Sequence, residues 1–165
     1  MEENKIPQPD FFNINPDVSS KEKEPESLES RFKKERLEWR AKIESMSKQM
    51  KKVLEISDLM TTVYTERELC IEYYHYLISY LIKINKIYRK KYSERYDFWS
   101  FKSQIRYPSD QSKNNKILVE IADLVEQREI IENHSKFILS TCSVIDNIIY
   151  AIPKRIEIEQ ITRGK

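Results

Sequence analysis

The chain contains neither proline nor glycine between Glu26 and Tyr107, and its only glycine is Gly164. Tight β-hairpin turns depend on residues that tolerate a positive φ, glycine above all, so an antiparallel sheet is hard to build from this sequence. Leu, Ile, Glu, Lys and Tyr are abundant and 34% of the residues are charged, which is typical of helical proteins. The sequence therefore predicts an all-α fold in a single domain.

Two long stretches carry residues at the spacing of a helix face. From Tyr74 to Trp99 the apolar steps are three, four and once seven residues, as expected for one side of a helix. From Ile117 to Ile149 steps of four and three alternate, which is the repeat of a coiled coil. Helices joined by a short polar link pack side by side in opposite directions. We predict a long antiparallel helical hairpin over residues 62–150.

The turn of this hairpin is expected at Tyr107–Asp110, because a proline biases the residue before it away from helix. The first helix of the hairpin is accordingly predicted over about 62–104, and the second from the turn to about Tyr150. Arg128 and Ser135 fall in the seam of the second helix. Polar residues at seam positions commonly fix the register and the oligomeric state.

Residues 1–25 contain four of the six prolines and six acidic residues against three lysines. Such a segment cannot bury enough apolar surface to offset its ordering entropy, so we predict a disordered acidic leader. The pair Phe11-Phe12 is an exception in this segment: it is either a docking motif for a partner or a patch without a role. A first helix is predicted over 26–57. It is followed either by a break near Ser57–Thr62, where several side chains can cap a helix, or by a continuous helix through these residues.

The remaining helical domain, residues 58–165, ends in an apolar segment that follows a proline suited to the first turn of a helix. We predict a separate short helix over 153–163. Its isoleucines leave it apolar on more than one side, so it docks either on its own core or on a neighbouring subunit. The candidate oligomerisation residues are Ile152, Ile156, Ile158 and Ile161.

Charge is arranged in blocks along the chain. Residues 31–52 hold nine basic residues and three acidic ones, residues 53–82 hold one and five, and residues 83–106 hold eight and two. The last block, which we name the basic aromatic flank, has aromatic rings interleaved with its cations. Cations that neutralise phosphates beside rings that stack on bases are characteristic of sequence-independent single-strand binding.

If the helix continues through the basic aromatic flank, four of its cations fall within an arc of about 60°. These are Lys91, Arg95, Lys102 and Arg106. The candidate nucleic-acid-binding residues are Lys90, Lys91, Arg95, Tyr96, Phe98, Lys102 and Arg106. The aromatic rings also fit a second interpretation, in which they belong to the packing seam and the cations form a solvated helix face.

The sequence offers little for catalysis. His75 and His134 lack metal-ligand spacing, and we expect both to be partly exposed helical residues. Cys70 and Cys142 are expected to be buried reduced thiols. Loops that cradle phosphates need glycines, which are missing before the C-terminus. We predict a cytoplasmic protein that is not an enzyme, has no cofactor or metal, and crosses no membrane, because no apolar run reaches about 18–20 residues.

Three motifs occur in order along the helical domain: Tyr64-Thr65-Glu66-Arg67, Ser93-Glu94-Arg95-Tyr96-Asp97-Phe98-Trp99, and Ile156-Glu157-Ile158-Glu159. Together they resemble the UvsY-type recombination mediators of T4-like phages, over about residues 58–164. The second motif is similar to a family stretch, Lys-x-Arg-apolar-Asp-aromatic-aromatic, whose basic residues contact DNA. Here Arg95 matches, and Ser93 stands where the family has Lys, with Lys90 and Lys91 one turn back. The third is similar to the family's C-terminal assembly segment, with aliphatic residues in place of Trp and Phe.

The resemblance implies a function that composition does not supply. Such mediators bind single-stranded DNA coated by a single-strand-binding protein and help to load a RecA-like recombinase. They form ring-like homo-oligomers and consume no nucleotide themselves.

Two other interpretations remain open. One is a coiled-coil structural or adaptor protein without DNA binding, which would assemble through the seam at 117–149. The other is a protein-binding antagonist of host machinery that acts through Phe11-Phe12 and requires the leader.

Overall fold

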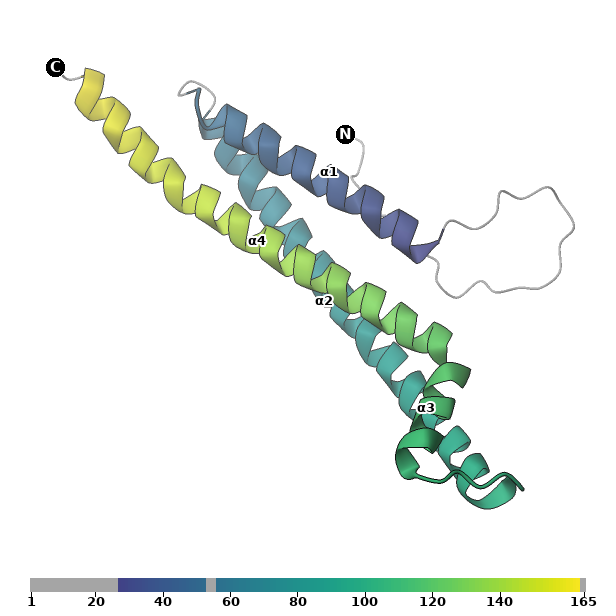
Figure 1. Ribbon diagram of the computed structural model, residues 1–165. Coiled ribbons are helices and arrows are strands. Elements are labelled where there is room, and N and C mark those ends of the chain that lie inside the picture. The colour runs from purple at the N-terminus through teal and green to yellow at the C-terminus, as the bar shows by residue number, and fades with distance from the viewer. Residues whose placement is uncertain (1–26, 53–55, 164–165) are drawn as a thin grey trace, which may run out of the picture.

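The computed structural model describes residues 27–52 and 56–163, and all regular structure in these residues is helical (Figure 1). The elements are α1 (Leu28–Gln49), α2 (Ile56–Asp97), the π-helical turn η2 (Phe98–Lys102), α3 (Asp110–Glu120) and α4 (Ala122–Arg163). The predicted all-α fold is confirmed for this part of the chain. The predicted leader, with its aromatic pair, lies outside the described residues.

The two longest helices, α2 and α4, lie side by side over most of their length (Figure 1). Arg67 Nε donates to Asp146 Oδ1 at 2.6 Å, and further along α2 the Tyr73 hydroxyl lies 3.5 Å from His134 Nε2. Because partner numbers fall on α4 as they rise on α2, the helices run in opposite directions. The helix α1 packs on this pair, mainly against α4.

Each long helix has a series of buried apolar residues that recurs every seven positions, and α2 and α4 bury further residues besides. The buried series are Phe32, Trp39 and Met46 on α1; Ile56, Val63, Cys70, Leu77 and Ile84 on α2; and Ile131, Ile138, Ile145 and Ile152 on α4. This is the spacing of helices that pack as in a coiled coil. Full burial of such an aliphatic or aromatic side chain contributes about 1.5–3 kcal/mol to stability.

The first break between helices lies earlier than predicted. The helix α1 starts at Leu28, where the Ser27 side chain accepts a hydrogen bond from the Ser30 backbone N–H at 3.2 Å, and it ends at Gln49. The expected break at 57–62 is wrong, because these residues already belong to α2. The hydroxyl of Thr62 donates to the Asp58 carbonyl at 3.0 Å, so it bonds back into the helix instead of capping one.

The end of α2 also differs from the prediction. Regular α-helix stops at Asp97, and the π-helical turn follows, closed by a hydrogen bond from the Ser103 N–H to the Phe98 carbonyl at 2.9 Å. Ser103 itself is extended, with ψ of 141°. A π turn holds more residues than an α turn and shifts the direction of the side chains that follow. The predicted helix to residue 104 is therefore too long.

The C-terminal half is divided into helices at other positions than predicted. The helix after the turn is interrupted at Ile121, where φ is −114° and ψ is 22°. The next helix, α4, then continues through Pro153 to Arg163, so the predicted separate helix over 153–163 is wrong. Proline removes one backbone hydrogen bond but does not end the helix here, because Ile152 and Ile156 on either side pack on the core.

One described helix, α4, is long and apolar enough by length and composition to cross a membrane. This is weak evidence, since the core helix of a protein in water meets the same criterion. In this fold the most apolar face of α4 is covered by α1 and α2.

The two polar seam residues of α4 are accommodated differently. Ser135 is buried, and its hydroxyl donates to the Ile131 carbonyl at 2.8 Å, which is a hydrogen bond within its own helix. The Arg128 guanidinium carbon lies 4.9 Å from the centre of the Tyr88 ring on α2, which is a cation–π contact between the helices. That these residues set the register stays a prediction.

Candidate nucleic-acid interface

The basic aromatic flank occupies the end of α2, the turn η2 and the segment before α3, at one end of the molecule (Figure 1). Lys90 and Lys91 are exposed on α2. The Lys90 ammonium lies 4.0 Å from a carboxylate oxygen of Glu94, one turn further on, and both side chains are largely in solvent. Such an exposed pair holds its lysine weakly, so both lysines are accessible to a phosphate.

Arg95 is tied to a neighbouring helix. Its Nε lies 3.5 Å from Glu120 Oε2 at the end of α3, and Trp99 Nε1 donates to the same oxygen at 3.2 Å. Lys116 lies 3.7 Å from the other oxygen of this carboxylate. The Arg95 side chain remains 48% exposed. Arg95 therefore forms an ion pair that joins α2 to α3, and its exposed part can still contact an anion from solvent.

The two predicted stacking rings have different surroundings. The Lys113 ammonium lies 4.1 Å from the centre of the Tyr96 ring, and the Tyr92 ring stacks at 6.5 Å. Phe98 packs edge-to-face against Trp99 with ring centres 5.0 Å apart and stays partly exposed. Of the two, Phe98 is the ring with fewer cationic and aromatic neighbours among the described residues.

Lys102 and Arg106 do not continue the row of Lys91 and Arg95, which corrects the predicted arc. Lys102 ends the π-helical turn and Arg106 lies in the segment beyond it. The arc assumed 100° per residue throughout, and this assumption fails once the α-helix has ended. Both cations remain exposed at the same end of the molecule.

Two features of this region were not among the predicted site residues. Phe101 is 81% exposed, more than any other large apolar residue described. Lys113 on α3 lines a surface pocket of about 580 Å³ together with Phe101 and Arg106. Its hydrogen bond to Asp110 raises the pKa of Lys113, with partial opposition from burial. Lys113 comes from another helix, so spacing along α2 could not identify it.

The predicted oligomerisation residues are divided between core and surface. Ile152 is buried in the core of its own chain, and Ile156 packs against that core. Ile158 and Ile161 are 55% and 59% exposed near the end of α4. Only the last two offer apolar surface to a neighbour.

A buried polar cluster lies between α1, α2 and α4. His134 has no exposed surface, which corrects the expectation of a partly exposed residue. Its Nε2 donates to Glu35 Oε2 at 3.0 Å, and its Nδ1 accepts from Arg36 Nε at 3.4 Å. Tyr73 donates its hydroxyl to the same Glu35 oxygen, and Phe32 stacks on the imidazole at 4.0 Å.

The cluster shifts two ionisation equilibria. Burial favours the neutral form of Glu35, but hydrogen bonds from His134, Tyr73 and Arg31 outweigh it and hold the pKa of Glu35 below its ordinary value. Burial, together with the hydrogen bond to Glu35, raises the pKa of Tyr73. All of these groups are engaged with one another, so the cluster joins three helices. The part of the chain that the structure describes contains no group of three His, Cys, Asp or Glu side chains arranged to hold a metal.

The two cysteines, which lack paired spacing in the sequence, meet between α2 and α4. Their sulfur atoms lie 2.6 Å apart, and both residues are buried free thiols. The hydrogen bond to Cys142 and burial both raise the pKa of Cys70. The predicted burial of these residues is confirmed.

Comparison with protein-family models, with curated proteins and with solved structures gave no match to this chain.

Proposed function

We propose that this protein is a recombination mediator that binds single-stranded DNA and helps to load a RecA-like recombinase onto strands coated by a single-strand-binding protein. The observation that carries the proposal is the concentration of exposed cations and exposed aromatic rings at one end of the molecule. Lys90, Lys91, Lys102 and Arg106 supply the cations there, and Phe98 and Phe101 are the most accessible rings. The resemblance to UvsY-type mediators supports the same role.

The proposed contacts follow from the chemistry of the strand. Lysine and arginine side chains neutralise phosphates and release counterions, which gives affinity independent of sequence. Phe98 and Phe101 offer ring faces on which bases stack, worth about 1–3 kcal/mol per base. In this proposal Arg95 and Tyr96 contribute at the edge of the site, because Glu120 and Lys113 already occupy part of their surfaces.

The proposal includes self-assembly into a ring-like homo-oligomer through the exposed isoleucines of α4. A ring repeats a modest basic surface several times, so many weak contacts act together at a high effective concentration. The antiparallel pair α2 and α4 would separate the DNA-binding end from the assembling end of each subunit. The protein would act in the cytoplasm with the recombinase and the single-strand-binding protein as partners, and it would hydrolyse no nucleotide.

The test is the fluorescence anisotropy of a labelled single-stranded oligonucleotide, titrated with the full chain at several salt concentrations. The variant Lys90→Glu with Lys91→Glu should weaken binding by about tenfold or more and lower the slope of log affinity against log salt by about 1.4, for two lost phosphate contacts. The matched control is Lys48→Glu with Lys51→Glu, which makes the same charge change on or just after α1, far from the flank.

Equal loss of affinity in both double variants would mean that net charge alone attracts the oligonucleotide. If the folded protein fails to bind single strands at low salt, the coiled-coil adaptor becomes the better interpretation. The adaptor has one observation in its favour, namely the buried heptad series on all three long helices.

A further inference from the structure

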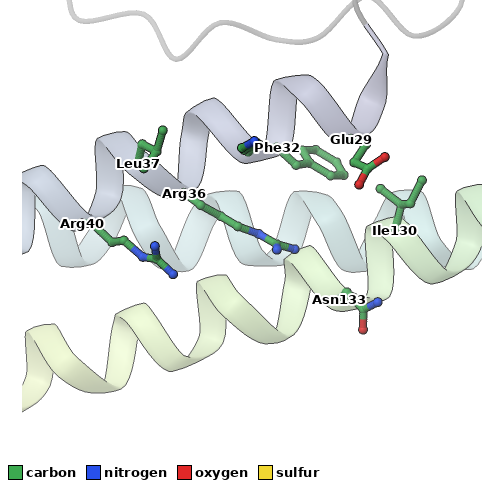
Figure 2. Close-up of a pocket in the computed structure, with 8 residues that line it drawn as sticks. Glu29, Phe32, Arg36, Leu37, Arg40, Ile130 and Asn133 are labelled. Atoms are coloured by element: carbon green, nitrogen blue, oxygen red, sulfur yellow. The ribbon is translucent and has the colours of Figure 1, made fainter.

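A second surface is a groove between α1 and α4 (Figure 2). Its volume is about 470 Å³. Phe32 is almost completely buried beneath it, whereas Leu37 on α1 is 56% exposed and Ile130 on α4 is partly exposed. The groove therefore has apolar surface on both of the helices that form it.

The groove is also basic. Lys33, Arg36 and Arg40 line it from α1, against the single acidic residue Glu29. Arg36 and Arg40 extend from α1 toward α4 (Figure 2). Arg36 is engaged, since it donates to His134 Nδ1 and lies over the Phe137 ring. Lys33 and Arg40 are exposed and make no ion pair within the described residues. An occupant of this groove should combine negative charge with apolar side chains.

The leader, residues 1–25, has that composition. It carries six acidic residues against three lysines, and its apolar side chains include Phe11, Phe12 and Ile14. It joins the fold at Ser27, immediately before α1, and Glu29 near that end of α1 already lines the groove. The fifteen residues from Phe12 to Ser27 can span up to about 50 Å when extended. The groove-lining part of α1 is only about 18 Å long, so the leader can fold back over it.

We propose that the leader docks into the groove of its own chain, with Phe11-Phe12 against Leu37 and Ile130 and its acidic side chains facing Lys33 and Arg40. A tethered segment acts at an effective concentration in the millimolar range, so weak contacts are sufficient for occupancy. The leader then covers the cationic face of α1 and shields it from other polyanions. This inference goes beyond the proposed mediator function and does not depend on it, because it concerns a different surface.

The experiment places the photo-reactive residue p-benzoylphenylalanine at Phe12 in the full chain. An equal mixture of unlabelled and ¹⁵N-labelled protein is irradiated, and the cross-linked peptides are identified by mass spectrometry. The expected products join the leader to peptides that contain Leu37 or Ile130. Both peptides of each product should carry the same isotope, and the yield should not depend on protein concentration.

Charge reversal then tests the electrostatic part. Lys33→Glu with Arg40→Glu should lower the yield of these products by about tenfold, since two attractions become repulsions. The control Lys48→Glu with Lys51→Glu makes the same charge change outside the groove and should leave the yield unchanged. Adding Asp10→Lys with Asp17→Lys to the Lys33→Glu, Arg40→Glu variant should restore the yield of the groove products. All four groove and control positions are exposed, and circular dichroism checks that the helices are retained.

Three results would overturn the inference. Products of mixed isotope would show that the leader belongs to a second copy. Products spread over the whole surface would show that the leader has no preferred site. If no product forms in the groove and the groove variant weakens oligonucleotide binding, the occupant is nucleic acid and not the leader.

Discussion

His134 illustrates how a single residue acquires a role that its neighbours in the sequence do not reveal. It is one of two histidines, and it carries no motif. In the fold it is fully buried between Phe32 and Phe137 and joined to Glu35 and Arg36. Burying a carboxylate and an imidazole is costly unless each polar atom has a partner. The cluster provides these partners from three helices, so it ties α1 to the α2–α4 pair.

A prediction at this scale concerns Glu35. Replacement of Glu35 by Gln should lower the free energy of unfolding by about 1–3 kcal/mol near neutral pH, because charge-assisted hydrogen bonds from buried partners are lost. The folded-state pKa of Glu35 is lowered, so its contribution is present above the unfolded-state pKa and disappears as the pH falls through the folded-state pKa. Urea unfolding at fixed protein concentration, from about pH 7 to about pH 3, measures this.

The difference between wild type and Glu35→Gln should therefore shrink as the solution is acidified. The control is Glu44→Gln, which removes an exposed partner of Lys48 on the same helix and should change little at any pH. A difference that stays constant down to the lowest pH would show that the carboxylate charge is not what stabilises the cluster.

At the scale of elements, the helices differ from expectation at their ends far more than in their interiors. The helix interiors agree with the prediction because apolar residues recur in every turn and each turn adds to the same signal. Their ends depend on a few side chains and on what packs nearby. Threonines that could cap a helix instead bond back within α2, and a proline that could begin a helix is carried inside α4. Local signals for starts and stops are weak, and tertiary contacts decide between them.

Pro153 gives a prediction at this scale. Proline in a helix interior costs about 3 kcal/mol relative to alanine, and it leaves the carbonyl of Ile149 without its usual backbone donor. Pro153→Ala should raise the free energy of unfolding by about 1–2 kcal/mol, the smaller value reflecting its position within three turns of the end of α4. Thermal or urea unfolding measures this, with Lys154→Ala next to it as the control. A loss of stability would instead show that the proline shapes α4 to fit the core.

At the scale of the whole molecule, the fold is elongated, and the basic aromatic flank and the C-terminal end of α4 lie at opposite ends (Figure 1). The basic aromatic flank lies where α2 gives way to α3, and the C-terminal end of α4 lies at the opposite end of the antiparallel pair. The groove between α1 and α4 lies between these two ends. In the proposed function, strand binding at one end and subunit contact at the other would therefore not compete.

Assembly is predicted to depend on the far end of α4. Ile158→Ser with Ile161→Ser removes two exposed apolar side chains and should convert a ring-like oligomer into smaller species, with weaker DNA binding through lost avidity. Sedimentation velocity measures the size. Leu139→Ser with Val144→Ser is the control, because it changes two partly exposed aliphatic residues in the middle of the same helix. Dissociation by the control alone would show that the exposed middle of α4, and not its C-terminal end, carries the assembly.

The sequence by itself determined the class of structure and the interior of each long helix. With a single glycine, the chain has few tight turns available, and its apolar residues repeat with the period of a packed helix. That period alone identifies core residues on two of the helices, namely Phe32, Trp39 and Met46 on α1 and Ile131, Ile138 and Ile145 on α4. The basic aromatic flank, too, is visible in the sequence, because its charges and rings are close neighbours along the chain.

Only the tertiary structure decided which residues from different helices meet. The Glu35–Tyr73–His134 cluster, the two facing cysteines and the approach of Lys113 to Tyr96 all join side chains from separate elements. The structure likewise assigned Ile152 to the core and Ile158 to the surface. The physical reason is that periodicity reports which face of a helix is apolar, whereas the partner of that face depends on how the helices pack in three dimensions.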